Sequence, residues 1–509
     1  MNTTNNCSHS EQHKVVPAGL DTPVQRHERK HMQTIFNGES TLVVAMIVAY
    51  IAFTAWLTIK LRSRTSDQFM TGARAMPAVV VGVLMMSEFI GAKSTVGTAQ
   101  EAFQSGMAAG WAVLGASIGF LLFGLLMVKK LYSSGEYTIS AAIAQKYCKS
   151  TMLTVSMIMI YALLLVNVGN YVSGAAAIST ALHVSLPVAM CIIAVVSTFY
   201  YMFGGLKGVA WVTILHSAIK VIGIVIIFAV AMSLTGGIAP IQAKLPAYYF
   251  TWDGKIGFAT IFAWTFGTVG AIFSTQFIVQ AISSTPSADD ARKATFYAAA
   301  FCLPLGFLLA LIGVAARFLY PDMKSLYALP VFLEKMPPLA SAFVTTSLVA
   351  SIFVSVCTVA LAIASLVVRD FYVPYWKPTQ ERELKMTRLF SVLIGVVPLV
   401  FVFFIPEILK LSFFTRALRL SITLVAMMGF YLPLFASNRG ATAGLIGAAI
   451  STTVWYLLGN PFGIDNMYIA AVTPLVVMVI ERLALGRPPV GLAAPAAAQP
   501  NALAERTST

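Results

Sequence analysis

The sequence is poor in charged residues. Asp, Glu, Lys and Arg make up 11% of the 509 residues, whereas hydrophobic residues make up 58%. Soluble domains carry about 25% charged residues, which keep their surfaces hydrated. So little charge excludes an ordinary soluble protein. We therefore predict an all-α polytopic membrane protein.

Cysteine and histidine are also scarce, and neither forms a cluster. The five cysteines have no metal-ligand spacing, and we expect most of them to pack as small hydrophobic side chains: Cys7, Cys148, Cys191, Cys302 and Cys357. His216 is the only histidine well inside an apolar segment. A membrane enzyme would need convergent His, Asp or Cys groups near one interface. The sequence therefore predicts no enzyme, no cofactor and no metal beyond a coupling cation.

Long apolar runs are what the sequence has instead. At about 20 apolar residues per crossing, we predict thirteen transmembrane segments, or twelve without the one near Arg416, which is interrupted by Lys410, Arg416 and Arg419. The segments begin near Thr41, Met76, Met107, Thr151, Leu186, Val209, Ile256, Lys293, Ala342, Met386, Arg416, Gly440 and Met467. We expect a disordered periplasmic leader at 1–40, a transporter domain at 41–486 with its repeat core at about 76–459, and a disordered cytoplasmic tail at 487–509.

Basic residues gather in every second loop. Lys60 to Arg74, Lys129 to Lys149 and Arg369 to Lys385 are examples, whereas the turns at 101–106 and 183–185 contain neither Lys nor Arg. Because cytoplasmic loops are enriched in Lys and Arg, we predict a multi-pass protein of the inner (plasma) membrane with its N-terminus outside and its C-terminus in the cytoplasm. These loops explain the net charge of +14, so we expect a lipid bilayer and a small solute as partners, with neither nucleic acid nor an obligate protein partner.

Two of the segments are interrupted by small and hydroxyl residues. The second carries Glu88 and Lys93 around Gly91–Gly97, and the seventh contains Gly267, Gly270, Ser274 and Thr275. Unwound backbone inside a membrane must be satisfied by protein, a cavity or a solute. Broken helices five segments apart are typical of an inverted repeat of five plus five helices with its solute near the bilayer midplane. Glycine is common in membrane helices anyway, so a purely structural origin remains open.

Four stretches of sequence carry a family resemblance. They are Ile90–Gly97, the aromatic double-glycine stretch Tyr200–Thr213, Gln276–Gln280 followed by Ala291–Lys293, and Ser355–Tyr372 with Asp370. In their order and spacing they resemble the sodium:solute symporter family. The resemblance runs from about Thr41 to Gly486 and implies a leucine-transporter-like fold of about thirteen helices.

The resemblance also implies a sodium site. It assigns carbonyl ligands to Ser87 and Ile90 on the first core helix and further ligands to Ser351, Val354 and Ser355 on the eighth. Two positions depart from the family pattern. Val354 stands where many members have a hydroxyl residue, and Ile214 stands where many have an aspartate, which argues against an additional sodium site.

Intramembrane charge offers an alternative to sodium. Thr213, Ser217 and Lys220 share one helical stripe, so Lys220 could point into the bundle. There, Lys220 or Glu88 would act as a proton site, or the Lys220 ammonium would stand in for a cation. The alternative is that Lys220 snorkels to an interface.

An organic anion is the simplest match to a lysine in an unwound stretch. We expect Lys93 and Ser94 to hold a carboxylate, with four polar partners on the seventh segment: Thr268, Ser274, Thr275 and Gln276. The sequence thus predicts a symporter that imports a small organic anion, coupled to sodium. A proton-coupled symporter or a uniporter for an amino acid or sugar is the alternative of the same fold. A channel or a membrane sensor is the alternative of a different class.

Overall fold

The computed structural model describes residues 39–182, 184–401, 408–486 and 489–490. All regular structure in these residues is helical, as expected. The expected leader up to residue 38 and the tail from 491 lie outside the described residues. The α-helices are α2 (Glu39–Lys60), α3 (Ser66–Thr71), α4 (Ala78–Phe89), α5 (Ala92–Ser105), α6 (Trp111–Leu126), α7 (Val128–Tyr132), α8 (Ile139–Ala144), α9 (Lys149–Leu182), α10 (Leu186–Thr235), α11 (Ile238–Lys244), α12 (Phe258–Ser274), α13 (Gln276–Ile282), α14 (Ala288–Leu319), α15 (Pro338–Leu366), α16 (Val373–Trp376), α17 (Gln380–Phe401), α18 (Ile408–Tyr431), α19 (Asn438–Leu457) and α20 (Asn466–Leu483).

Polar residues fix where several helices begin. The side chain of Ser287 accepts a hydrogen bond from the backbone N–H of Asp290 at the start of α14, and Ser437 does the same for Gly440 in α19. Such caps satisfy backbone N–H groups that have no partner within the helix. Both helices therefore begin within a few residues of the predicted starts near Lys293 and Gly440.

The predicted count of thirteen spans is not confirmed. Among the described residues, nine helices are long and apolar enough to cross a membrane, or up to eleven if each bent helix pair counts as one span. One reason is that the two segments predicted near Leu186 and Val209 join end to end at a non-helical break at Gly205, so they are counted together as one 49-residue apolar helix, Pro187–Thr235. Another is that the segment predicted near Met76 is divided between α4 and α5, each shorter than a full crossing.

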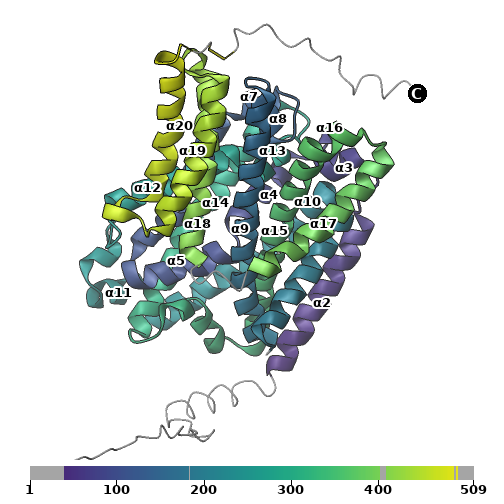
Figure 1. The fold of residues 1–509 in the computed structure, drawn as a ribbon. Coiled ribbons are helices and arrows are strands. Elements are labelled where there is room, and N and C mark those ends of the chain that lie inside the picture. Colours follow the sequence, from purple (N-terminus) through teal and green to yellow (C-terminus); the bar gives the residue numbers. More distant parts are fainter. Residues whose placement is uncertain (1–38, 183, 402–407, 487–488, 491–509) are drawn as a thin grey trace, which may run out of the picture.

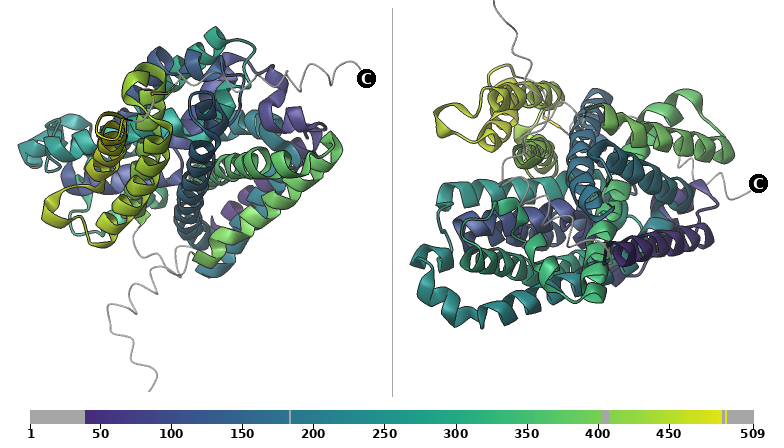
Figure 2. Two further views of the ribbon diagram at one scale, coloured as in Figure 1. Left: turned by 45° about the horizontal axis from the view of Figure 1, so that its top comes forward. Right: turned by 90° about the horizontal axis from the view of Figure 1, so that it is seen from below.

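Helix α15 lies at the centre of the bundle, with α2 at one side and the α19–α20 pair at the other (Figures 1 and 2). In its most apolar window 94% of α15 is buried, against 22% for α2. Large side chains such as Trp56 remain 49% exposed on α2. A peripheral helix with exposed apolar side chains fits contact with lipid, whereas α15 contacts other helices on all sides.

The two interrupted segments are broken at a single point each. The chain leaves the helix at Ile90 and Gly91 between α4 and α5, and at Thr275 between α12 and α13, where the bend is 52°. Gly97, Gly267 and Gly270 lie inside helices, so both interruptions are shorter than predicted. Gly267 and Gly270 instead permit close packing, because an added Cβ would lie 2.2 Å from Met467 and 2.3 Å from Leu420.

Candidate functional site

The first break brings α15 against the unwound backbone. At Ile90 the backbone has φ −99° and ψ 62°, and Gly91 is extended, so the Ile90 carbonyl points away from the helical ladder. A Cβ on Gly91 would lie 2.2 Å from the Ser355 Oγ. Glycine therefore lets α15 approach the break closely, as the resemblance implied for the first and eighth core helices.

Lys220 points into the bundle rather than to an interface. Its side chain is 1% exposed, and its Nζ donates to the Ile90 carbonyl at 2.7 Å and to the Ser87 Oγ at 2.8 Å. The hydroxyls of Ser87 and Ser217 share a hydrogen bond of 2.6 Å. Thr213 and Ser217, on the same stripe of α10, are also buried. Snorkelling is thus wrong for Lys220, whose ammonium binds two residues predicted to serve sodium.

The serines of α15 complete this cluster of oxygen atoms. Ser351 is 1% exposed, and its Oγ has no hydrogen-bond partner among the described residues, whereas the Ser355 Oγ donates to the Ser351 carbonyl at 3.2 Å. Val354 is buried and contributes no hydroxyl. A hard cation needs several oxygen ligands. As arranged, these residues do not fit a sodium ion, because Ile90 and Ser87 already accept hydrogen bonds from an ammonium.

The polar residues of the second break face α18. Thr268 and Thr275 accept hydrogen bonds from Arg416 and Arg419, at 2.7 and 2.8 Å, and the Ser274 Oγ donates to the Arg419 carbonyl at 2.7 Å. Gln276 lies apart from them. Its side chain bonds the Tyr137 carbonyl and the Ile139 N–H, both at 2.9 Å, and so holds the segment before α8.

Arg416 and Arg419 are the residues that sequence reasoning missed as site candidates. From the sequence they are only interruptions of an apolar run. In the structure Arg419 is 5% exposed, and both guanidinium groups interact electrostatically with Glu88 of α4. Charge inside a membrane is costly and marks functional positions. That rule, applied to the weakest predicted span, would have found them.

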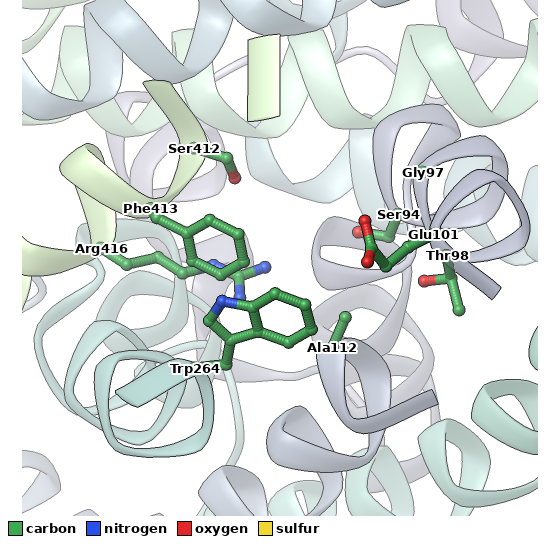
Figure 3. Close-up of a pocket in the computed structure, with 9 residues that line it drawn as sticks. All are labelled: Ser94, Gly97, Thr98, Glu101, Ala112, Trp264, Ser412, Phe413 and Arg416. Carbon is green, nitrogen blue, oxygen red and sulfur yellow. The ribbon is translucent and has the colours of Figure 1, made fainter. Parts of the chain in front are cut away.

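Arg416 lines a cavity between α5, α6, α12 and α18 (Figure 3). The stacked rings of Trp264 and Phe413, 5.1 Å apart, lie on the arginine side, and Glu101 lies on the opposite side (Figure 3). The cavity is small, with a volume of about 30 Å³, and is partly open to solvent. Its lining residues are Ser94, Gly97, Thr98, Glu101, Ala112, Trp264, Ser412, Phe413 and Arg416. It thus combines a fixed cation, a carboxylate and an aromatic wall.

The first break supplies only some of the residues predicted for the substrate. Ser94 lines the cavity, although its Oγ also donates to the Phe89 carbonyl at 2.6 Å. Lys93 is the second residue of α5, and its side chain lies outside the described part of the structure. The structure therefore brings together Ser94, Thr268 and Arg416, with Ser274 and Thr275 beside Arg419.

The chain is similar to known transporters in both sequence and fold. The human high affinity choline transporter 1 is 24% identical over 65% of this chain, and the match spans 62% of its own length, less than two thirds. The sodium/glucose cotransporter of Vibrio parahaemolyticus is 21% identical over 68% of this chain and 72% of its own.

A solved Na⁺-coupled sialic acid symporter in a substrate-bound outward-open state has a similar fold. Its TM-score is 0.76 at 18% identity, covering 88% of this chain and 98% of that chain. A nucleobase-cation-symport-1 family transporter in a closed conformation gives a TM-score of 0.56 at 14% identity, covering 84% of this chain and 97% of that chain. These neighbours confirm the predicted leucine-transporter type of fold.

The family model matches most of the described chain. The model of the sodium:solute symporter family covers residues 69–447, which include both breaks, α15 and the whole of α18. The resemblance drawn from the four motifs is confirmed, as is a class of multi-pass membrane transporters rather than enzymes. At the level of the family, sodium is the coupling ion. The chain belongs to the sodium:solute symporter family.

Proposed function

We propose that the protein is a secondary active symporter that imports a small carboxylate with sodium across the inner membrane. The N-terminus lies outside and the C-terminus lies in the cytoplasm in this proposal, following the basic loops. The single observation that carries the solute class is Arg416, a guanidinium that lines a cavity between broken helices. Solutes of this fold type bind near the midplane, between the repeats.

Arginine suits a carboxylate for geometric reasons. A guanidinium presents parallel N–H donors that match the two oxygens of a carboxylate. Arg416 is held by Thr268 at 2.7 Å and lies 5.2 Å from the Phe413 ring centroid, so it is oriented before a solute arrives. In this proposal Arg416 binds the carboxylate of the solute, and the Ser94 hydroxyl is a further hydrogen-bond partner. Lys93 is a second candidate for the positive charge.

A zwitterionic amino acid is the second candidate. It is favoured by Glu101, which lines the cavity opposite Arg416 (Figure 3). A carboxylate on that side suits the ammonium of an amino acid, while Arg416 binds its carboxylate. A simple monocarboxylate has no positive group for Glu101.

Uptake into proteoliposomes tests the proposal. Labelled organic acids, amino acids and sugars would be offered under a sodium gradient or a proton gradient, imposed separately. We expect uphill accumulation of a carboxylate-bearing solute, with Arg416→Gln weakening its apparent affinity about 10- to 100-fold, the usual value of a hydrogen bond to a charged group. Arg416→Lys should lose nearly as much, because lysine lacks the paired donors.

The controls separate the two solute classes from a general defect. Arg482→Gln, at the end of α20 and far from the cavity in sequence, should leave uptake unchanged at equal membrane abundance. Glu101→Gln should impair an amino acid and spare a simple carboxylate. Full uptake of all acids by Arg416→Gln would mean that Arg416 does not bind the solute, and it would contradict the proposal that the solute is an anion.

A further inference from the structure

We infer that Lys220 competes with sodium for the cation site between the first break and α15. The inference rests on the proposed symport function and names the residue that sets its sodium requirement. While the ammonium lies on the Ile90 carbonyl, sodium is excluded there. When the ammonium leaves, the same oxygens become available to sodium.

The ammonium is positioned as a bound cation would be. Two of its three protons are used, on the Ile90 carbonyl at 2.7 Å and on the Ser87 Oγ at 2.8 Å. The Ser87 hydroxyl is in turn fixed by Ser217, one helical turn before Lys220 on α10. The carbonyl freed by unwinding at Ile90 is thus satisfied by a cation that belongs to the chain.

Within the described part of the chain, no carboxylate lies at ion-pair distance from the Lys220 ammonium. Among the described residues, the ion pairs within 4.0 Å join other lysines and arginines to acids. A buried ammonium without an acidic partner depends on carbonyl and hydroxyl dipoles. The same dipoles would bind sodium, so either the ammonium or a sodium ion can occupy them, but not both at once.

Repulsion makes this exclusion strong. An ammonium and a sodium ion about 4 Å apart repel each other. At the effective dielectric constant of about 20 that suits such sites, this repulsion weakens sodium binding by roughly a thousandfold. Sodium therefore binds beside the ammonium only at very high concentration. Displacement of the ammonium is the alternative open to it.

The serines of α15 show that the site has kept ligands for a free cation. The Ser351 Oγ is buried and has no hydrogen-bond partner in the part of the chain that the structure describes, and Ser355 lies against the break beside Gly91. An ammonium that had replaced sodium entirely would need neither a spare buried hydroxyl nor the close approach of α15. A buried hydroxyl without a partner is costly. The arrangement therefore supports competition rather than loss of the sodium site.

Sodium binding to purified protein without solute tests the inference. We would measure ²²Na⁺ binding and the sodium-dependent rise in melting temperature for wild type, Lys220→Met and Lys220→Gln, with choline chloride keeping the ionic strength constant. Both variants remove the charge, and we expect their sodium affinity to rise at least 10-fold. Lys220→Arg keeps the charge and should remain as weak as wild type. Lys207→Met, on the same helix, is the matched control and should change nothing.

Equal sodium affinity in wild type and in both neutral variants would overturn the inference. So would failure of either variant to bind sodium. If the neutral variants do not fold, Ser351→Ala decides, because it removes a hydroxyl that a free cation would use and that the ammonium does not bond; unchanged sodium affinity in that variant would overturn the inference. Binding of a labelled carboxylate by wild type in sodium-free buffer is measured separately. Failure of the carboxylate proposal would show as absent binding in that measurement, whereas failure of the present inference would show in the sodium measurements.

Discussion

Gly91 is the residue at which the broken helix meets α15. An alanine there would place its Cβ 2.2 Å from the Ser355 Oγ, closer than real Cβ contacts allow. We expect Gly91→Ala to lower the free energy of unfolding by about 1–3 kcal/mol, the usual cost of overpacking. Thermal unfolding in detergent would measure it.

Two further variants make this test specific. Adding Ser355→Ala removes the oxygen that clashes and should restore part of the loss, leaving the contact to the Cβ of residue 355 at 3.2 Å. Gly97→Ala is the control, because nothing lies within 4 Å of its added Cβ. A loss of stability as large in Gly97→Ala would mean that the contact with α15 is not the cause.

Part of the candidate site could be predicted from residue types, but the rest depends on how the helices pack. Lys220 could be predicted to face the bundle, because Thr213 and Ser217 share its stripe. Its bond to Ile90 depends on how α10 packs against α4, which no spacing within one helix determines. Arg416 was visible as a charge in an apolar run, yet only packing showed that it reaches Thr268 on α12. Gln276 has the chemistry of a site residue, but the loop before α8 binds it.

At the scale of helices, α10 consists of two helical stretches that meet at Gly205, where the backbone is not helical. Gly205 has φ 55° and ψ −162°, a conformation that side chains with a Cβ rarely adopt, and an added Cβ would lie 2.8 Å from the Phe69 Cα. We expect Gly205→Ala to cost at least about 1–3 kcal/mol from backbone strain alone. Yield of folded protein and melting temperature would measure the effect.

The neighbouring glycine offers the matched comparison. Gly204 has ordinary helical backbone, and its added Cβ would meet the Val209 N at 3.3 Å, which a small shift accommodates. Gly204→Ala should therefore be much milder than Gly205→Ala. The predicted segments starting near Leu186 and Val209 place a boundary between them, but only the backbone angles show that Gly205 makes it. Equal losses from the two variants would contradict the assignment to Gly205.

At the scale of the whole molecule, the orientation in the membrane is tested at Cys148. This thiol precedes α9 in a loop predicted to be cytoplasmic. Burial raises the pKa of the Cys148 thiol, but hydrogen bonds with Ser150 and Thr151 outweigh burial and lower it to about 7. We expect a membrane-impermeant maleimide to label it from the cytoplasmic side, with a rate that rises up to about pH 7 and then levels off.

The pH dependence follows from the thiolate, which is the reactive form. A lowered pKa means that about half of the Cys148 side chains are thiolate at pH 7, against a few per cent for an ordinary thiol. The experiment uses a Cys7→Ala and Cys191→Ala background, since Cys302 and Cys357 are buried. Cys148→Ser is the control. Labelling only from the periplasmic side would reverse the proposed topology.

The contact between Lys220 and Ile90 has an energetic consequence for transport. An ammonium tethered to the chain returns with it and transfers no net charge over a full cycle. One sodium ion crossing a membrane potential of 100 mV provides about 2.3 kcal/mol, or roughly a 50-fold accumulation ratio. A transport cycle completed with the ammonium in place therefore moves solute without that driving force. The larger the fraction of such cycles, the smaller the solute gradient that the cell can maintain.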